Sequence, residues 1–164
     1  MKYAKPLHLF RDLVKASSSG SGRLLGLDVG DKYVGLAVSD ANNATASPLS
    51  VLVRKKSTIE LMAIDFQCLI SELSLIGFVV GCPFDRHRRC PQSVIIKLFI
   101  DELCKNERLE GMKYTFWDEC FTSKSVELML KPLSFHPVVA KTMTDKFAAV
   151  GILQGYLDHV NQMQ

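Results

Sequence analysis

The sequence predicts a mixed α/β domain in which a five-stranded sheet is flanked by helices. Two apolar segments near the start are joined by a Gly-Asp turn, which is typical of an antiparallel hairpin. Short apolar runs later in the chain have the pattern of buried strands, and segments with helical periodicity lie between and after them. A chain of 164 residues that is 48% hydrophobic can form one core, which excludes a wholly disordered protein.

The first two predicted strands lie in residues 24–40. The segment from Leu24 to Leu27 is fully apolar, as expected of a strand buried on both faces, and Asp28 follows it directly. Gly30 begins the predicted hairpin turn. A carboxylate at the end of a core strand costs free energy unless it has a use there. Asp28 is therefore a candidate functional residue, and a turn-capping role is the alternative.

The remaining elements alternate between strand and helix patterns. In order, we expect a strand at 44–54, a helix to residue 73, a strand at 75–80, a helix at 93–106, a strand at 113–117, a helix at 124–130 and a final helix that opens near Thr142 or Thr144. Strand-helix alternation after an antiparallel hairpin predicts a mixed sheet with helices on its faces. Residues 23–160 are expected to form this single domain.

Residues 1–22 are predicted to be a flexible, basic extension that ends in a Ser/Gly linker. Leu7, Phe10 and Val14 could form one side of a short helix. The segment lacks the long apolar stretch of a secretory signal, so we expect a cytoplasmic protein, with organellar targeting by this segment as the open alternative. No apolar run approaches the roughly 20 residues needed to span a bilayer, so no membrane partner is expected.

The cysteines and the net charge exclude few classes of function. The five cysteines include no CxxC pair, which favours reduced thiols over a disulfide framework or a zinc site. A formal net charge of +3 permits a nucleic-acid partner without requiring one.

Acidic side chains follow two of the predicted core strands. Asp28 ends the first strand, and Asp118 and Glu119 follow residues 113–117. Ligands of open α/β sheets bind outside the carboxyl ends of strands, and Asp145 in the expected first turn of the last helix is a third acid that could join them. Converging carboxylates need a cation, and ligands that are all oxygen suit Mg²⁺ or Mn²⁺.

Each of these acids has an open alternative. Strand alternation points Asp118 and Glu119 to opposite faces, so at most one of them is expected at such a site, and the pattern does not say which. Asp145 could simply complement the dipole of its helix.

A basic loop follows the strand at 75–80 and is expected at the same edge of the sheet. It contains Arg86, Arg88 and Arg89. These side chains, assisted by Lys32 in the hairpin turn, are candidate phosphate contacts for a nucleic-acid substrate. A solvated loop is the alternative interpretation.

Four segments of the chain resemble the YqgF family, which is also described as Holliday-junction-resolvase-like, and they occur in the family's order. They are residues 25–40, the Val-Val-Gly-Cys-Pro run at 79–83, the Trp-Asp-Glu-Cys-Phe-Thr run at 117–122, and the Asp-x-x-Ala-Ala-x-x-Ile-Leu-Gln run at 145–154. The resemblance extends from about Leu24 to Val160.

The resemblance implies a ribonuclease H-like fold and a Mg²⁺-dependent nuclease that acts on structured RNA or DNA. The usual assignment in the family is processing of the 5′ end of precursor ribosomal RNA during ribosome biogenesis. By this resemblance, Asp28 is the first metal ligand, Asp118 or Glu119 the second and Asp145 the third. Their implied role is to hold an ion that activates a water and neutralises charge on the scissile phosphate.

Two positions depart from the family pattern. Cys120 stands where the family has an arginine, and the loop after Pro83 is rich in arginine where the family has small residues. These departures bear on substrate contacts more than on metal binding. The alternatives are a non-catalytic nucleic-acid-binding or ribosome-binding module of the same fold, and a Holliday-junction resolvase, which would need a homodimer to cut two strands symmetrically. An actin-like nucleotide-binding protein would need a second domain.

Overall fold

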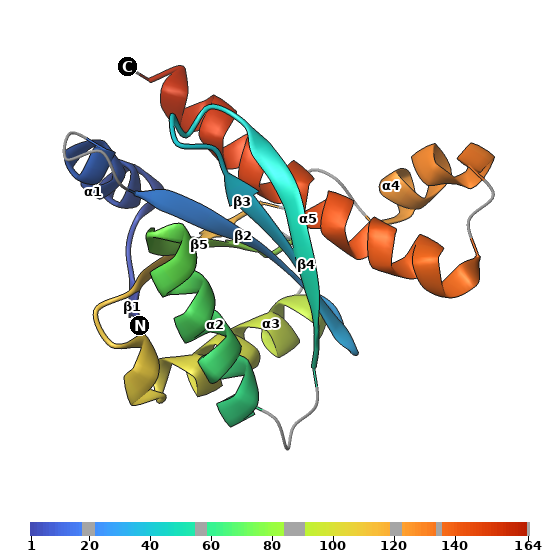
Figure 1. Cartoon of the computed structure of the whole chain (residues 1–164), viewed down its shortest axis with the longest axis horizontal. Coiled ribbons are helices and arrows are strands. Elements are labelled where there is room, and N and C mark those ends of the chain that lie inside the picture. The colour runs from blue at the N-terminus through green and yellow to red at the C-terminus, as the bar shows by residue number, and fades with distance from the viewer. Residues whose placement is uncertain (18–21, 55–58, 84–90, 119–122, 134–135, 164) are drawn as a thin grey trace.

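The structure is a computed structural model that describes residues 1–17, 22–54, 59–83, 91–118, 123–133 and 136–163. One mixed sheet has the strand order β1-β6-β5-β2-β3-β4, and helices cover both of its faces (Figure 1). The strands are β1 (Lys2–Tyr3), β2 (Arg23–Val29), β3 (Tyr33–Ser39), β4 (Ala46–Val53), β5 (Leu75–Gly81) and β6 (Lys113–Trp117). The helices are α1 (Pro6–Ser17), α2 (Ile59–Leu73), α3 (Pro91–Cys104), α4 (Ser123–Leu130) and α5 (Pro137–Asn161), with short 3₁₀ turns η2 (Glu107–Leu109) and η3 (Lys131–Leu133).

The predicted mixed sheet is confirmed, with one strand more than expected. β2 pairs antiparallel with β3, and β3 pairs antiparallel with β4. β2 and β5 are parallel, and so are β5 and β6. The sixth strand is β1, which pairs with β6 in parallel. Two residues are too few to give the alternating pattern by which a strand is recognised in sequence.

The prediction that the N-terminal segment is a flexible extension is wrong for residues 1–17. Leu9 and Leu13 are 0% and 1% exposed. The predicted short helix is α1, and Phe10 of the predicted apolar side is buried at 8% exposure, whereas Leu7 and Val14 lie on the flank and are 42% and 45% exposed. The Ser/Gly stretch at 18–21 lies outside the described residues.

The last helix begins earlier than predicted. α5 starts at Pro137, a residue favoured in the first helical turn, instead of near Thr142 or Thr144. Asp145 therefore lies more than two turns inside the helix. Its expected role as a first-turn acid that complements the helix dipole is excluded, because that effect falls off within the first turn.

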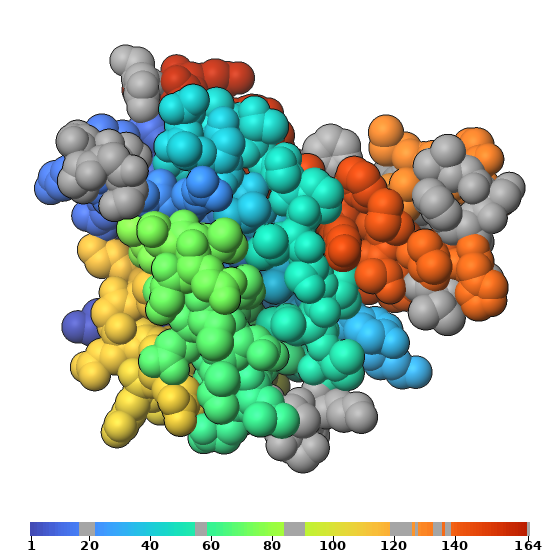
Figure 2. Space-filling view, viewed as in Figure 1, coloured from blue at the N-terminus to red at the C-terminus, as the bar shows by residue number. Residues whose placement is uncertain are grey.

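The sheet separates two apolar cores. One core lies between the sheet and helices α2 and α3, and the other lies between the sheet and helices α1 and α5. Glycines on the second face allow α5 to approach closely: a Cβ at Gly26 would lie 2.7 Å from Cβ of Leu153 and 2.9 Å from the carbonyl oxygen of Ala149. Figure 2 shows α4 and the start of α5 projecting beyond this body.

In the described part of the chain, no helix is both long and apolar enough to cross a membrane. Cys68, Cys82 and Cys104 form no disulfide within the described part of the chain, whereas Cys90 and Cys120 lie outside it.

Candidate catalytic site at the sheet rim

Asp28 is the penultimate residue of β2 and is half-buried. In the antiparallel ladder it lies directly opposite Gly35 of β3. Residues that face each other in such a ladder direct their side chains to the same face of the sheet. Gly26, two residues before Asp28, faces α5. Asp28 therefore has its side chain on the face that α5 covers.

The backbone of α5 lies directly on Gly35. A Cβ at this position would overlap the carbonyl group of Asp145 and would lie 3.3 Å from its Cα. Because Gly35 is the direct partner of Asp28, the structure places Asp145 beside Asp28 across the interface between sheet and helix. Two of the predicted acids, separated by more than a hundred residues, thus meet at the carboxyl end of β2.

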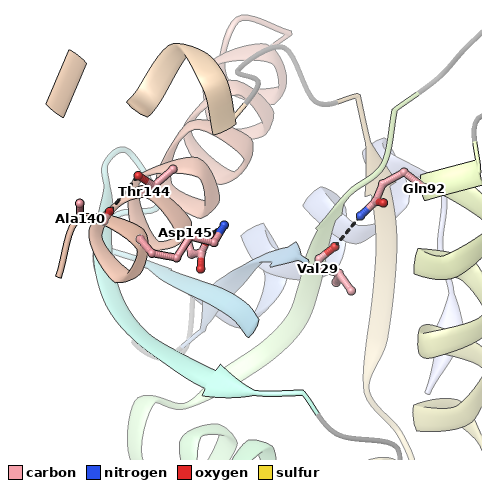
Figure 3. A network of polar contacts seen from close by, with 6 residues as sticks. Val29, Gln92, Ala140, Thr144 and Asp145 are labelled. Carbon is pink, nitrogen blue, oxygen red and sulfur yellow. Dashed lines mark hydrogen bonds and ion pairs between the residues drawn. The ribbon is translucent and has the colours of Figure 1, made fainter. Parts of the chain in front are cut away.

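The two carboxylate oxygens of Asp145 have different surroundings. The residue is 5% exposed. Its Oδ1 accepts a hydrogen bond and ion pair from Nζ of Lys141 at 2.7 Å. Its Oδ2 is buried and has no hydrogen-bond partner among the residues that the structure describes, and Figure 3 shows the side chain extending from α5 toward the sheet. A buried carboxylate oxygen without a partner costs free energy, and a bound cation would remove that cost.

Asp118 directly follows β6, which is two strands away from β2 in the sheet, and it is exposed. The preceding Trp117 packs on the α5 face, with ring centroids 5.5 Å from Tyr156 and 5.0 Å from His159, so alternation gives Asp118 the opposite face. Glu119 lies outside the described residues, and within those ranges no three His, Cys, Asp or Glu side chains are grouped closely enough to hold a metal ion.

The candidate phosphate contacts are described only in part. Lys32 is exposed in the turn between β2 and β3, where its carbonyl oxygen accepts a 2.7 Å hydrogen bond from the backbone N–H of Arg54. Arg86, Arg88 and Arg89 lie outside the described residues.

The two described flanks of that basic loop are both fixed at the carboxyl ends of strands. The backbone N–H of Cys82 donates to the carbonyl of Trp117 at 2.9 Å. Nε2 of Gln92 donates to the carbonyl of Val29 at 3.3 Å (Figure 3). The chain therefore leaves β5 and enters α3 at the same rim as Asp28.

Lys141 and Gln92 contribute to the site but are not among the residues predicted from the sequence. Lys141 could have been found, because it precedes Asp145 by four residues and such pairs are neighbours on a helix. Nothing in the local sequence marks Gln92, since its partner is a backbone carbonyl of a distant strand.

A second concavity lies on the other face of the sheet, away from Asp145. This pocket of about 460 Å³ is lined by Asp31, Arg54, Ile59, Met62, Ile95, Leu98, Phe99 and Glu102. The Arg54 guanidinium lies 4.9 Å from the centre of the Phe99 ring and donates to the carbonyl of Gly30 at 3.0 Å. Arg54 thereby holds the hairpin turn that follows Asp28.

Comparison with known proteins identifies the family of the chain. The model of the RuvX family, described as Holliday junction resolvase, matches residues 22–159. A protein named "Putative pre-16S rRNA nuclease" from Caldicellulosiruptor saccharolyticus is 35% identical over 144 residues, which cover 85% of this chain and 99% of the relative. A protein of the same name from Clostridioides difficile is 37% identical over 140 residues, covering 84% and 94% of the two chains.

A solved structure supports the fold assignment. The Thermus thermophilus RuvC structure superposes with a TM-score of 0.52 at 13% identity and covers 85% of this chain and 96% of that one. At this identity the likeness concerns the fold, and it confirms the predicted ribonuclease H-like architecture. From the family match over residues 22–159 and from these relatives, the chain is a member of the RuvX family.

Proposed function

We propose that this protein is a divalent-metal-dependent nuclease that hydrolyses phosphodiester bonds in structured nucleic acid, with precursor ribosomal RNA as its substrate in the cytoplasm. Membership of the RuvX family and the names of the relatives support a nuclease. The observation that carries the proposal is the buried, unpartnered Oδ2 of Asp145, on a helix whose backbone lies on the strand partner of Asp28.

The residues at the rim fit a hard divalent ion. Asp28 and Asp145 offer only carboxylate oxygens, the donors that Mg²⁺ and Mn²⁺ prefer. Two neighbouring carboxylates repel each other, and the ammonium group of Lys141 offsets only part of that charge because its side chain is 58% exposed. A cation between the two acids would satisfy Oδ2 and remove the repulsion.

The third carboxylate is assigned to Glu119 in preference to Asp118. Trp117, the last residue of β6, is on the α5 face, and a continued strand period would point Asp118 to the opposite face. The exposure of Asp118 supports this choice.

In the proposed reaction the side chains have separate roles. Asp28, Glu119 and Asp145 would hold the ion, and Lys141 fixes the rotamer of Asp145 through its ion pair with Oδ1. The bound ion would polarise the scissile phosphate and offset the charge that develops on it. Lys32 and the arginines at 86, 88 and 89 contact the flanking phosphates and hold the substrate in register.

The test is cleavage of labelled precursor ribosomal RNA with and without Mg²⁺. Asp28→Asn should reduce cleavage at least a hundredfold while the circular dichroism spectrum stays unchanged, because the amide keeps the shape and loses the charge. Asp31→Asn is the matched control, since Asp31 is an exposed aspartate of the same hairpin. Glu119→Gln should be as inactive as Asp28→Asn, and Asp118→Asn should stay active. Full activity of Asp28→Asn would overturn the mechanism.

Four-way DNA junctions are the second candidate substrate, because the matching family model carries the description of a Holliday junction resolvase. Symmetric cleavage of a junction requires a homodimer. The same assay with a labelled junction, together with the mass of the protein in solution, separates the two substrates. Tight binding of either nucleic acid with no cleavage in Mg²⁺ or Mn²⁺ would identify a non-catalytic binding module instead.

A further inference from the structure

The positive charge of the chain is concentrated at its N-terminus. The first 17 residues contain Lys2, Lys5, Arg11 and Lys15 and a single acid, Asp12, for a formal net charge of +3. The whole chain also has a formal net charge of +3, so the charges of all later residues cancel. This segment precedes the residues that the RuvX family model matches, which begin at 22.

This basic segment is part of the folded body. Leu9 and Leu13 are buried in the core that α1 shares with α5. A Cβ on Gly77 of β5 would lie 2.6 Å from Cδ1 of Leu9, so the glycine makes room for this side chain. The hydroxyl of Tyr156 on α5 donates to the carbonyl of Pro6 at 2.8 Å. The cations of α1 are therefore held in a fixed place relative to the sheet.

The cations are available at the surface. Lys2, Lys5, Arg11 and Lys15 are all exposed. Asp12, the one acid of the segment, forms an ion pair in which its Oδ2 lies 2.7 Å from Nζ of Lys113. In the described part of the chain, the four cations make no ion pair with a carboxylate. Arg11 and Lys15 are four residues apart and share the outward stripe of α1, opposite the buried leucines.

We infer that β1 and α1 form a second phosphate-binding surface, which holds RNA that extends away from the catalytic rim. The inference rests on the proposed nuclease function, and it adds that the RNA substrate is long enough to reach this second surface. α1 and the Asp145 site lie on the same face of the sheet, joined by α5. At a rise of 1.5 Å per residue, Asp145 and Tyr156 are separated by about 16 Å along α5. That distance corresponds to several nucleotides of an RNA strand.

RNA is a better partner for this surface than a membrane. A basic amphipathic helix that binds lipid must insert its apolar face into the bilayer. In α1 that face is Leu9, Phe10 and Leu13, which are 0%, 8% and 1% exposed and already packed in the protein core. The side of α1 that remains offers cations, and its partly exposed apolar residues are only Leu7 and Val14 on the flank, at 42% and 45%. This surface suits a phosphate backbone better than insertion into a bilayer.

The test compares two triple variants with the same change in charge. Lys5→Gln/Arg11→Gln/Lys15→Gln removes three cations from the proposed surface. Lys97→Gln/Lys105→Gln/Arg108→Gln removes three exposed cations from α3, η2 and the residues between them, outside the α1 and α5 layer. Binding of a labelled structured RNA is measured in EDTA from 50 to 300 mM KCl, where no metal-dependent cleavage occurs. Thermal melting confirms that both variants fold.

The α1 variant should lower the slope of log Kd against log salt by about 2, since each lost phosphate contact contributes about 0.7. Its RNA affinity at 100 mM salt should fall at least tenfold, and an RNA too short to extend beyond the rim should bind both variants alike. Equal slopes in the two variants would overturn the inference. So would an α1 variant that binds RNA normally and loses binding to vesicles containing phosphatidylserine. The absence of cleavage in Mg²⁺ would overturn the nuclease function alone, because the salt slope does not depend on it.

Discussion

Each half of α5 contains a buried polar side chain, and the two differ in whether their polar atoms have hydrogen-bond partners. Near its start, Asp145 is buried with one carboxylate oxygen unpartnered. Near its end, Tyr156 is 0% exposed, and its single hydroxyl donates to the carbonyl of Pro6 at 2.8 Å. Buried polar groups in proteins are normally satisfied, as Tyr156 is. Under the proposed function, the unsatisfied carboxylate is in the half of the helix that binds the ion, and the satisfied phenol is in the half that stabilises the fold.

Asp145→Asn tests the first side of this comparison and should have the largest effect. We expect cleavage to fall at least a hundredfold, because the amide cannot provide the charge that holds the ion. The melting temperature in EDTA should stay unchanged or rise, because a buried charge with an unpartnered oxygen is removed. The ion pair that is lost involves an exposed lysine and stabilises the fold little. A large loss of stability in EDTA would show that Asp145 is a structural residue.

Gly35→Ala tests how the first half of α5 is positioned. The added methyl group would overlap the backbone of Asp145, so helix and sheet must move apart. We expect a loss of about 1–3 kcal/mol in the free energy of unfolding, as for other overpacked cores, together with a clear loss of cleavage.

Gly155→Ala is the control from the second half of the same helix. Its Cβ would lie 3.2 Å from Nε1 of Trp117, a side chain that can shift, and alanine favours the helix by up to about 1 kcal/mol. Urea unfolding of both variants measures the difference. Equal stability of Gly35→Ala and the native protein would contradict the close contact.

Tyr156→Phe tests the second half of the comparison and should have the smallest effect. Loss of one hydrogen bond should lower the free energy of unfolding by about 1 kcal/mol and leave cleavage unchanged. Burial raises the pKa of Tyr156 above its ordinary value of 10. Above pH 10 the tyrosine of the unfolded chain loses its proton first, so the stability of the native protein should fall as the pH rises.

Melting curves between pH 8 and pH 11 measure this fall. The phenylalanine variant should lose less stability over this interval than the native protein. Some dependence should remain, because burial also raises the pKa of Tyr114 to about 12. Identical pH profiles for the two proteins would contradict the buried, protonated phenol.

The hairpin and the core strands could be predicted from the sequence because their signals are local. Residues 113–117 were assigned as a strand from their own side chains, and β6 has these bounds. Asp28 was identified as a candidate because a charge directly followed an apolar run. Its position beside Asp145 follows from pairing with Gly35, which the pattern of a single strand does not contain.

The elements whose role or bounds differ from the sequence prediction depend on tertiary packing. α1 was not recognised as part of the fold because its apolar residues fit two overlapping stripes, and only contact with β5 and α5 selects Leu9 and Leu13. α5 starts before the predicted Thr142 or Thr144 because proline, which ends most helical patterns, is tolerated at the first helical position. The lone oxygen of Asp145 could not be predicted, because burial and the absence of a partner are properties of the folded chain.

The contact between Gly35 and α5 has a consequence for how the family can vary. α5, which carries Asp145, contacts Gly35 of the sheet through its main-chain atoms, and these atoms are the same in every amino acid. The spacing between the two acids is therefore sensitive to the glycines under α5. At Gly35 and Gly26 even a methyl group would meet the backbone of α5 and displace the helix that carries Asp145.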